Sequence, residues 1–377
     1  MLSRPEWMRN RQGNQAVFGN YPRYHSILTK GVLFMRLGKI FAILASCVFA
    51  LFALSGCANV GNGKQIVRVA HSQTEKHPEH TAIVAFKKYV EERLGDKYEI
   101  QIFPNELLGG QKKVIELNQT GAIDIVIVGA PNVETVEKTF EIFSIPYLFG
   151  SKEAYFATMN DPSFTEKIYK TPEHAGFRVV TWYNAGLRSF YAKTPINTPD
   201  DMKGLKLRVQ QSPASIAMVN ALGGAATPMA FGEVYTAIQQ GVIDGAENNE
   251  LALTANKHGE VAKFYSNNMH QMIPDIVLAN VRFLEALPEA DRKVFMDGFK
   301  YSTEVELVEW EKQVEEAKKY AIEQQKVTFL NVDMSKFREK MLPLQDEIVK
   351  NNPSIKEYYD YIQKVNDKVE KEKKEAK

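Results

Sequence analysis

The sequence has very little cysteine and no excess of charge of one sign. Its 377 residues contain only Cys47 and Cys57, too few for a disulfide framework or for a zinc site built from cysteines. The formal net charge is +1, and it is −5 beyond residue 56, because residues 1–56 contain seven Lys or Arg but only one acidic residue, Glu6. A nucleic-acid-binding protein needs a basic surface for phosphates. The charge balance argues against that class.

Catalytic signatures are missing as well. The sequence has no G-x-G-x-x-G, Walker loop, G-x-S-x-G elbow or H-E-x-x-H, and each of those motifs carries a specific chemistry. We therefore predict that the protein is not an enzyme and uses no cofactor. With 44% hydrophobic residues the chain can form a sizeable core, and its length fits two domains.

A long apolar run is also lacking. The apolar run of residues 40–54 follows Arg36 and Lys39 and has fifteen residues, fewer than the roughly 18–20 that a transmembrane helix needs. A basic segment before a short apolar run is typical of an export signal. A membrane-spanning segment is the alternative.

The run ends in Leu54-Ser55-Gly56-Cys57, which resembles the bacterial lipobox. The resemblance implies that Cys57 is lipidated and becomes the first residue of the mature protein. Because Met35 begins a conventional signal by itself, we predict an upstream extension over residues 1–34, a signal peptide over 35–56 and a tether over 57–65. The mature protein is then expected in the periplasm or at the cell surface, anchored by lipid to a bacterial membrane.

Strand and helix patterns alternate beyond the tether, as in βαβ units with a mainly parallel sheet covered by helices on both faces. Strands are predicted at residues 66–70, 98–103, 123–128, 177–182, 188–192, 205–209 and 242–244, and helices at 81–93, 111–120, 214–222 and 233–240. One very long helix is predicted from Pro288 to about Lys326. The charge-dense segment from Gln363 to Lys377 is typical of a solvated helix end.

Two segments echo one another at an offset of about 120 residues: Asn118-Gln119-Thr120-Gly121-Ala122-Ile123-Asp124 and Ile238-Gln239-Gln240-Gly241-Val242-Ile243-Asp244. In both, a helix ends at a glycine suited to the left-handed position and passes into a strand. The echo favours two similar halves, although such junctions are common in α/β proteins. We predict an α/β fold with two lobes around a ligand crevice, which lies at the carboxyl ends of the strands.

The lobes are assigned from this pattern, with the long helix running along both. Lobe I is predicted to comprise residues 66–185 plus about 274–313, and lobe II residues 186–273 plus about 314–377.

Several side chains are candidates for a site. Arg208 closes a predicted strand and Arg188 opens another, and a buried guanidinium binds a carboxylate bidentately. Most arginines, however, are surface groups or structural ion pairs. The polar segment 245–250 follows a predicted strand and suits either a ligand's hydroxyl groups or a turn. His71, His77 and His80 lie within ten residues, and histidine is the commonest metal ligand.

Three runs resemble the solute-binding subunit of tripartite ATP-independent periplasmic (TRAP) transporters, of the dicarboxylate-binding type. They are Lys203-Gly204-Leu205-Lys206-Leu207-Arg208-Val209, the segment Gly223 to Gly241 that contains Pro228-Met229-Ala230-Phe231-Gly232-Glu233-Val234-Tyr235, and Asp244-Gly245-Ala246-Glu247-Asn248. The resemblance covers essentially the whole mature chain. It implies a two-lobed binding protein that closes on an organic acid and delivers it to a small and a large membrane subunit.

The resemblance also implies roles for individual residues. Arg208 matches the carboxylate-binding arginine of the family, and Asn248 the residue that helps to hold that carboxylate. Arg188 matches a second basic contact, Phe231 an aromatic residue that packs on solute, and Glu247 a position beside the site. In the first lobe the resemblance places solute contacts around His71, Gln73 and His77, and near Glu106 to Gln111.

The resemblance favours a hexuronate or related sugar acid as the solute, with a C4-dicarboxylate as the next choice. Two other classes remain open. A zinc-binding lipoprotein requires His71, His77 and His80 to converge. An exported sugar-acid enzyme requires a general acid and base in one crevice, for which Glu247 and Glu106 are the candidates.

Overall fold

The computed structural model describes residues 63–376, which form one compact body. The predicted upstream extension, signal peptide and lipidated Cys57 lie outside the described residues. None of the helices in residues 63–376 combines the length and the apolar character needed to cross a membrane.

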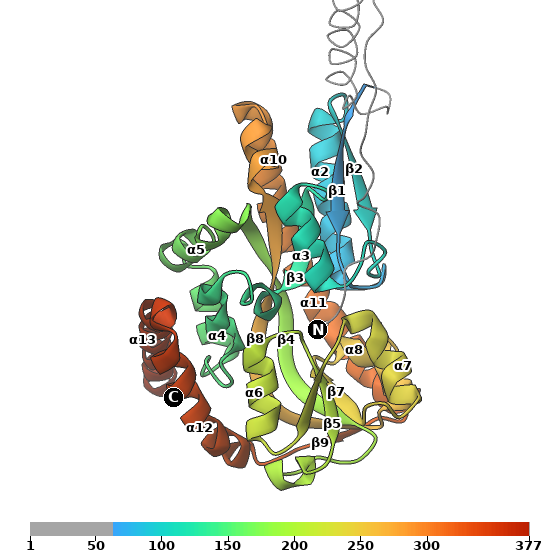
Figure 1. Ribbon diagram of the computed structural model, residues 1–377, viewed down its shortest axis with the longest axis vertical. Coiled ribbons are helices and arrows are strands. Elements are labelled where there is room, and N and C mark those ends of the chain that lie inside the picture. Colours follow the sequence, from blue (N-terminus) through green and yellow to red (C-terminus); the bar gives the residue numbers. More distant parts are fainter. Residues whose placement is uncertain (1–62, 377) are drawn as a thin grey trace, which may run out of the picture. The chain divides into compact units, whose positions relative to one another are not determined.

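A mixed sheet of nine strands forms the framework of the described chain (Figure 1). Its strand order is β2-β1-β3-β8-β4-β7-β5-β6, and β9 pairs with β8 off this path. The strands are β1 (Gln65–Ala70), β2 (Tyr98–Phe103), β3 (Ile125–Gly129), β4 (Phe177–Ala192), β5 (Lys206–Val209), β6 (Ala225–Pro228), β7 (Gly245–Asn248), β8 (Phe264–Asn280) and β9 (Thr328–Leu330).

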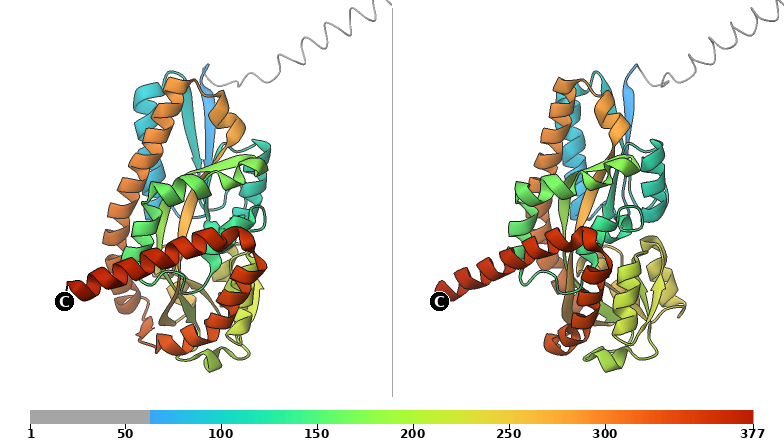
Figure 2. Two further views of the ribbon diagram at one scale, coloured as in Figure 1. Left: turned by 90° about the vertical axis from the view of Figure 1, so that its left-hand side faces the viewer. Right: turned by 60° about the vertical axis from the view of Figure 1, so that its left-hand side comes forward.

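Helices cover both faces of this sheet (Figures 1 and 2). The α-helices are α2 (Pro78–Leu94), α3 (Gln111–Thr120), α4 (Lys152–Met159), α5 (Pro162–Ile168), α6 (Pro213–Ala221), α7 (Val234–Gln239), α8 (Leu251–Thr254), α9 (His258–Val261), α10 (Val281–Ala286), α11 (Glu289–Glu323), α12 (Met334–Asn351) and α13 (Lys356–Glu375). Short 3₁₀ helices are η1 (Ala130–Val133), η2 (Lys138–Ser144), η3 (Thr171–Ala175), η4 (Pro199–Met202), η5 (Phe231–Glu233) and η6 (Pro353–Ile355).

The fold contains the same five-element unit twice. In the first βα unit, residues 65–129, β1 lies between β2 and β3 and is parallel to both. In the second βα unit, residues 206–248, β5 lies between β6 and β7 and is parallel to both. A helix follows each of the first two strands of each unit. The predicted internal similarity is therefore present in the topology.

The sequence echo occupies equivalent places in the two units. Gly121 and Gly241 end their helices with φ angles of 80° and 74°, in the left-handed region that glycine adopts without a steric penalty. Asp124 Oδ2 accepts a hydrogen bond of 2.8 Å from the Arg68 amide at β1, and Asp244 Oδ2 accepts one of 2.8 Å from the Lys206 amide at β5. The motif thus fixes the third strand of each unit to the first.

Burial on both faces explains the apolar strands of the first unit. Ile125 and Ile127 of β3 pack into a core with Phe86 of α2 and Phe299 of α11. Val126 and its alternating neighbours on the other face of β3 pack into a second core with the helices on that side. Alternate side chains of a strand point to opposite faces, so a strand buried on both faces is apolar throughout.

Two long antiparallel strands, β4 and β8, run through the middle of the sheet and join the units. The prediction of a mainly parallel sheet missed β8, and it divided β4 into two strands at residues 182 and 188. The structure has one strand with a register shift between Asn184 and Leu187. Gly186 lies in that shift with a φ of 66°, which is why the pattern there looked like a break.

The third strand of the second unit was also predicted in the wrong place. Strand β7 comprises Gly245–Asn248, not residues 242–244, and the polar segment taken for a loop is partly strand. The sequence Gly-Ala-Glu-Asn has low β-propensity. It is held as a strand by pairing with β4 on one side and β5 on the other.

The predicted long helix is confirmed as α11, which has 35 residues and begins directly after Pro288. It packs against α2 and β4, and farther along against α8. The C-terminal helix α13 packs against α4, where Asn366 Nδ2 donates to the Leu148 carbonyl at 2.9 Å. Its charged end extends beyond the body (Figure 2). The residue boundaries of the lobes stay a prediction.

Gly186 gives a test of the strand shift. A Cβ atom at Gly186 would lie 2.6 Å from Trp310 Cζ2, in addition to the strain of a positive φ. We expect Gly186→Ala to lower the free energy of unfolding by about 3 kcal/mol, from a left-handed backbone and an overpacked contact together. Gly204→Ala is the matched control, because Gly204 has a φ of +81° and no atom within 4 Å of its Cβ position. Urea unfolding of both variants measures the difference, and equal losses would show that the contact with Trp310 carries no cost.

Candidate functional site

Buried polar side chains from both βα units enclose a small cavity. Its lining comprises Gln73, Gln111, Ala185, Arg188, Arg208, Gln210, Phe231, Asn248, Asn249 and Asp275. Gln73 follows β1 and Gln210 follows β5, so the cavity lies at the carboxyl ends of the first strands of both units, as predicted. Its volume is about 20 Å³, close to the space of one water molecule. A larger solute therefore enters only if the two units move apart.

Arg208 lines this cavity, and among the described residues no carboxylate forms an ion pair with it. It is 4% exposed. Its Nε and Nη2 donate to the Met229 carbonyl at 3.1 and 3.0 Å, which leaves Nη1 uncommitted. The Phe231 ring centroid lies 5.5 Å from its Cζ atom. Burial lowers the pKa of Arg208 from its usual value, but the charge of Glu247 opposes that effect. The guanidinium stays charged and can bind an anion.

Arg188 is also buried, but its charge is already matched. Its Nε donates to Glu247 Oε2 at 2.6 Å and its Nη2 to Glu247 Oε1 at 2.9 Å, a bidentate pair. Burial alone raises the pKa of Glu247, yet the charge of Arg188 and hydrogen bonds from His270 and Arg188 lower it to about 2. Arg188 Nη1 donates to Asn248 Oδ1 at 2.8 Å. The pair therefore orients the Asn248 amide at the cavity wall.

Two amide oxygens of the cavity lack hydrogen-bond donors. Gln73 Oε1 and Gln210 Oε1 are both buried without a partner among the described residues. A buried acceptor without a donor costs about 1–3 kcal/mol. Since an amide oxygen accepts but does not donate, these two atoms suit a solute that carries hydroxyl groups.

A buried acidic cluster lies behind one wall. Asp275 lines the cavity, and its carboxyl group is within hydrogen-bond reach of Glu79. Burial raises the pKa of Asp275 to about 6, although Arg188 opposes the shift. Burial together with the charge of Asp275 also raises the pKa of Glu79 and of Glu306. Like charges this close and this buried do not all ionise, so the cluster retains protons at neutral pH.

The structure places the predicted site residues in three groups. Five line the cavity: Gln73, Arg188, Arg208, Phe231 and Asn248. Glu247 is not among the lining residues but pairs with Arg188, which is. His71, His77 and Glu106 are not among the lining residues. Glu106 instead accepts hydrogen bonds from the amides of Phe231 and Gly232 at 3.2 and 3.1 Å.

The three histidines do not form a metal site. His71 Nε2 lies 3.0 Å from His80 Nδ1, a hydrogen-bond distance, and His77 Nδ1 accepts from the Glu79 amide at the start of α2. The His77 ring packs edge-on against Trp310 at 5.8 Å between centroids. Burial lowers the pKa of both His71 and His77 to about 3. No group of three or more His, Cys, Asp or Glu side chains in residues 63–376 is arranged to hold a metal.

Three lining residues lie outside the candidates named from the sequence: Ala185, Gln210 and Asp275. Asn249 belongs to the polar candidate segment 245–250, and Gln111 ends the candidate segment from Glu106 to Gln111. Gln210 carried a usable signal, because it follows the strand that bears Arg208 just as Gln73 follows β1. Gln111 opens a predicted helix next to the same edge of the sheet. Asp275 lies in β8, which was not predicted, so nothing placed it near Arg188.

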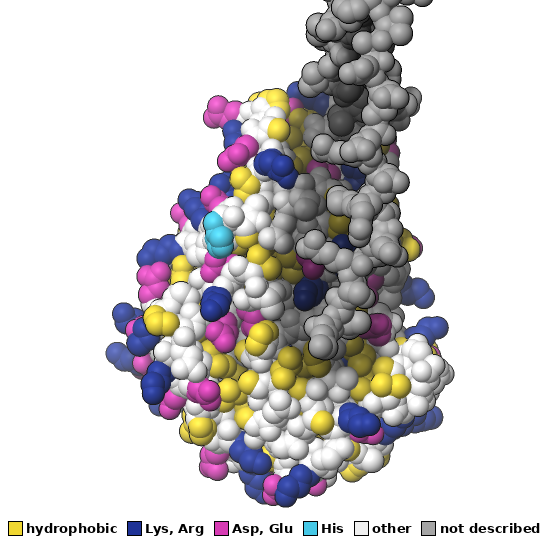
Figure 3. Space-filling model, viewed as in Figure 1, with side chains coloured by type: hydrophobic (Ala, Val, Ile, Leu, Met, Phe, Trp, Pro, Cys, Tyr) yellow, Lys and Arg dark blue, Asp and Glu magenta, His cyan; other side chains and the backbone are white. Residues whose placement is uncertain are grey.

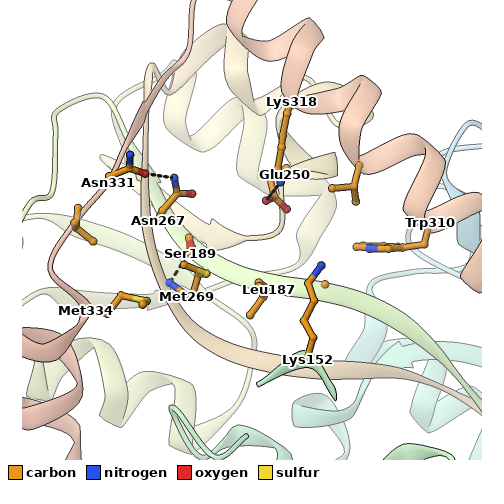
Figure 4. Close-up of a pocket in the computed structure, with 13 residues that line it drawn as sticks. Lys152, Leu187, Ser189, Glu250, Asn267, Met269, Trp310, Lys318, Asn331 and Met334 are labelled. Carbon is orange, nitrogen blue, oxygen red and sulfur yellow. Dashed lines mark hydrogen bonds and ion pairs between the residues drawn. The ribbon is translucent and has the colours of Figure 1, made fainter. Parts of the chain in front are cut away.

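A second pocket lies on the other face of β4, next to α11 (Figure 4). Its volume is about 280 Å³, and Leu187 and Ser189 line it where Arg188 lines the first cavity. Two of its charged groups are paired, since Lys318 lies 3.3 Å from Glu250, and Lys152 also lines it. It contains none of the buried polar atoms that lack a partner in the described chain. The smaller cavity is therefore the better candidate for a site.

The molecular surface carries charges of both signs. On the face shown in Figure 3, Lys and Arg side chains are interspersed with Asp and Glu. This face shows no continuous basic patch.

Known proteins with this sequence pattern are bacterial solute-binding proteins. The family model of DctP, described as bacterial extracellular solute-binding protein, family 7, matches residues 69–352. A protein of Salmonella typhimurium, YiiZ, whose activity its name leaves open, is 37% identical over 314 residues, which are 83% of this chain and 95% of that protein.

Solved structures agree with this match. A TRAP periplasmic solute-binding protein from Anaerococcus prevotii, with bound α/β-D-glucuronate, has a TM-score of 0.80 and 51% identity, covering 81% of this chain and 99% of that one. A TRAP periplasmic solute-binding protein from Sulfitobacter, with bound β-D-galacturonate, has a TM-score of 0.76 and 29% identity, covering 80% and 100%. The predicted two-lobed α/β fold and the family resemblance are confirmed.

Asp275 gives a pH prediction. Its pKa is raised from 3.8 to about 6, so between those values the folded protein holds a proton that the unfolded chain releases. The contribution of Asp275 to the free energy of unfolding therefore falls as the pH rises from 4 to 6. We expect Asp275→Asn to gain stability relative to the unmodified protein as the pH rises from 4 to 7, measured by urea unfolding at each pH.

The Asp275→Asn variant must be compared with the unmodified protein, because buried histidines change the stability with pH in the opposite direction. Burial lowers the pKa of His71, His77 and His258 to about 3, so their contribution is lost as the pH falls. These residues are unchanged in the variant and cancel in the difference. Asp346→Asn, at an exposed position, is the control. Parallel profiles for all three proteins would mean that Asp275 retains no proton.

Proposed function

The chain belongs to the family of bacterial extracellular solute-binding proteins, family 7, as a TRAP-transporter solute-binding protein, and from that premise we propose that its solute is a hexuronate. The observation that carries this proposal is the state of Arg208. Its guanidinium is buried in the cavity, and only one carbonyl oxygen accepts from it among the described residues. A carboxylate there gains a charge-assisted hydrogen bond in a desolvated place.

The charges around the cavity favour a solute with one carboxylate. Arg188 is neutralised by Glu247 at 2.6 Å, so Arg208 is the arginine of the cavity with charge to spare. A second carboxylate would lie near Asp275 with no free cation to match it. A C4-dicarboxylate, the other solute class that the sequence suggested, is therefore disfavoured.

The remaining walls favour hydroxyl groups. Gln73 and Gln210 each have a buried amide oxygen without a donor, and Asn248 and Asn249 add further amides to the lining. A sugar acid supplies several O–H donors, whereas an ionised simple dicarboxylate supplies none. The aromatic ring of Phe231 adds an apolar wall on the side of Arg208, against which a sugar ring can pack.

The similar solved structures support the same solute class. The Anaerococcus prevotii protein, at 51% identity, holds D-glucuronate, and the Sulfitobacter protein holds β-D-galacturonate. We infer that this chain captures a uronate outside the cytoplasm by closing its two βα units around it, and hands it to the membrane subunits of the transporter. Of the two, glucuronate is favoured by the higher identity.

We assign binding without turnover to this site. The two carboxylates that an acid–base mechanism would need, Glu247 and Glu106, have other partners. Glu247 is bound by Arg188, and Glu106 accepts from two backbone amides. A general acid or base must instead reach the reacting atoms of the solute.

Membrane attachment through lipid on Cys57 is part of the proposal. It is supported by the sequence Leu54-Ser55-Gly56-Cys57 after a short apolar run. A tether of a few residues then links the lipid to β1.

Arg208 provides the test of the solute class. We expect Arg208→Ala to weaken binding of D-glucuronate by about 100-fold or more, because truncating one partner of a buried charged pair costs about 2–5 kcal/mol. Isothermal titration with D-glucuronate, D-galacturonate, succinate and zinc compares the candidate ligands. Arg93→Ala, whose side chain stacks on Tyr89 at 3.6 Å, is the control arginine.

Two results would contradict the assignment. Equal affinity for D-glucuronate in the Arg208→Ala variant and the unmodified protein would remove Arg208 from the site. Binding of succinate or zinc with no binding of either uronate would replace the proposed solute class.

The lipid anchor has its own test. We expect Cys57→Ser to leave the membrane fraction and appear as released protein, because serine has no thiol to accept the lipid. Cys47→Ser, within the predicted signal peptide, is expected to stay with the membrane and serves as the control. Fractionation with detection by immunoblot distinguishes them. A Cys57→Ser protein that remains membrane-bound would show that the apolar run itself is the anchor.

A further inference from the structure

We propose that Glu106 holds the solute cleft closed by binding the backbone of the opposite βα unit, and does not contact the solute. This inference rests on the proposed function, because closure matters only for a protein that captures a solute. Glu106 belongs to the first unit, in the loop after β2. Its Oε1 accepts from the Phe231 amide at 3.2 Å and its Oε2 from the Gly232 amide at 3.1 Å, both in the second unit.

The loop that carries Glu106 is fixed to its own unit. The Asn105 amide donates to the Gln73 carbonyl at 3.0 Å, and the Glu106 amide donates to the His71 carbonyl at 3.2 Å. Both residues have a φ of 56°, a conformation that costs a non-glycine residue about 1–3 kcal/mol and persists only where the surroundings impose it. The carboxylate is thus held out rigidly toward the second unit.

The receiving backbone is shaped to accept that carboxylate. A Cβ atom at Gly232 would lie 2.8 Å from Glu106 Oε2, so glycine allows the close approach. A Cβ atom at Gly110 would likewise lie 2.9 Å from the Ala230 Cβ, which shows how tightly the two units meet at this seam. Among the described residues no salt bridge joins Glu106 to a cation, although the charge of Arg208 is close enough to favour its ionised form.

The contact acts on the wall of the cavity itself. Phe231, whose amide Glu106 binds, lines the cavity and faces Arg208. A second carboxylate, Glu134, follows the first unit in the sequence and also reaches the second unit, since its Oε1 accepts from the Ala214 amide at 3.0 Å. Glu134 is 6% exposed, whereas Glu106 lies nearer the surface. The hydrogen bonds that Glu106 accepts therefore lie at the rim of the cleft, and they must break before a solute leaves.

Solute release kinetics test this role. We expect Glu106→Ala and Gly232→Ala each to release D-glucuronate about tenfold faster, the effect of losing one or two charge-assisted hydrogen bonds, with little change in the association rate. Because both variants remove the same contact, the double variant is expected to match either single one. Stopped-flow binding and displacement measure both rates.

Glu233→Ala is the matched control. It removes an equal charge at the same helix, but Glu233 Oε2 accepts from the Ala230 amide at 3.0 Å within the second unit. We expect its release rate to equal that of the unmodified protein. Unchanged release in Glu106→Ala, additive effects of the two single variants, or equally fast release in Glu233→Ala would each overturn the proposal.

A second measurement separates this proposal from the choice of solute. Amide hydrogen exchange at Phe231 and Gly232 is expected to be slow in the unmodified protein and at least tenfold faster in Glu106→Ala, whatever ligand the protein binds. Failure of the unmodified protein to bind uronates would contradict the proposed function alone. Unchanged exchange at these two amides in Glu106→Ala would contradict the closing role of Glu106.

Discussion

The buried pair between Arg188 and Glu247 is the interaction on which the site depends. Its two charges lie on neighbouring strands, since Phe190 of β4 pairs in register with Glu247 of β7. A buried ion pair contributes little net stability but is costly to break, so its role here is one of arrangement. The pair neutralises Arg188 and orients Asn248. Arg208 is left without a carboxylate partner among the described residues. Under the proposed function, the guanidinium of Arg208 is thereby left for the carboxylate of a solute.

The repeated βα unit explains why the polar groups converge. Each unit places the carboxyl end of its first strand at the same place in the body, so Gln73 and Gln210 reach one cavity from two units. Asp124 and Asp244 hold the third strand of each unit to the first with hydrogen bonds of equal length. The strands that carry the site are therefore fixed within each unit, while the units meet mainly through side chains at the seam.

The strands β4 and β8 join the units and separate the two cavities. The side chain of Arg188 faces the solute cavity, while Leu187 and Ser189 face the second pocket beside α11 (Figure 4). Gly186 lies at the register shift next to Trp310. In the proposed closing role, the hydrogen bonds of Glu106 to the Phe231 and Gly232 amides oppose opening of the cleft, and Glu134 adds a hydrogen bond from the Ala214 amide.

The sequence by itself determined the local elements and much of the site. Periodicity and end signals located β1, β2, α3 and the long helix α11, because those features depend on neighbouring residues. The resemblance identified Arg208, Asn248 and Phe231, which line the cavity. Only the tertiary structure showed β7 and β8 as strands of one mixed sheet, because the pairing of distant segments overrides local propensity. For the same reason only the fold could bring Asp275 to Arg188, pair Arg188 with Glu247 and set Glu106 against the opposite unit, since those contacts join residues 59 or more positions apart.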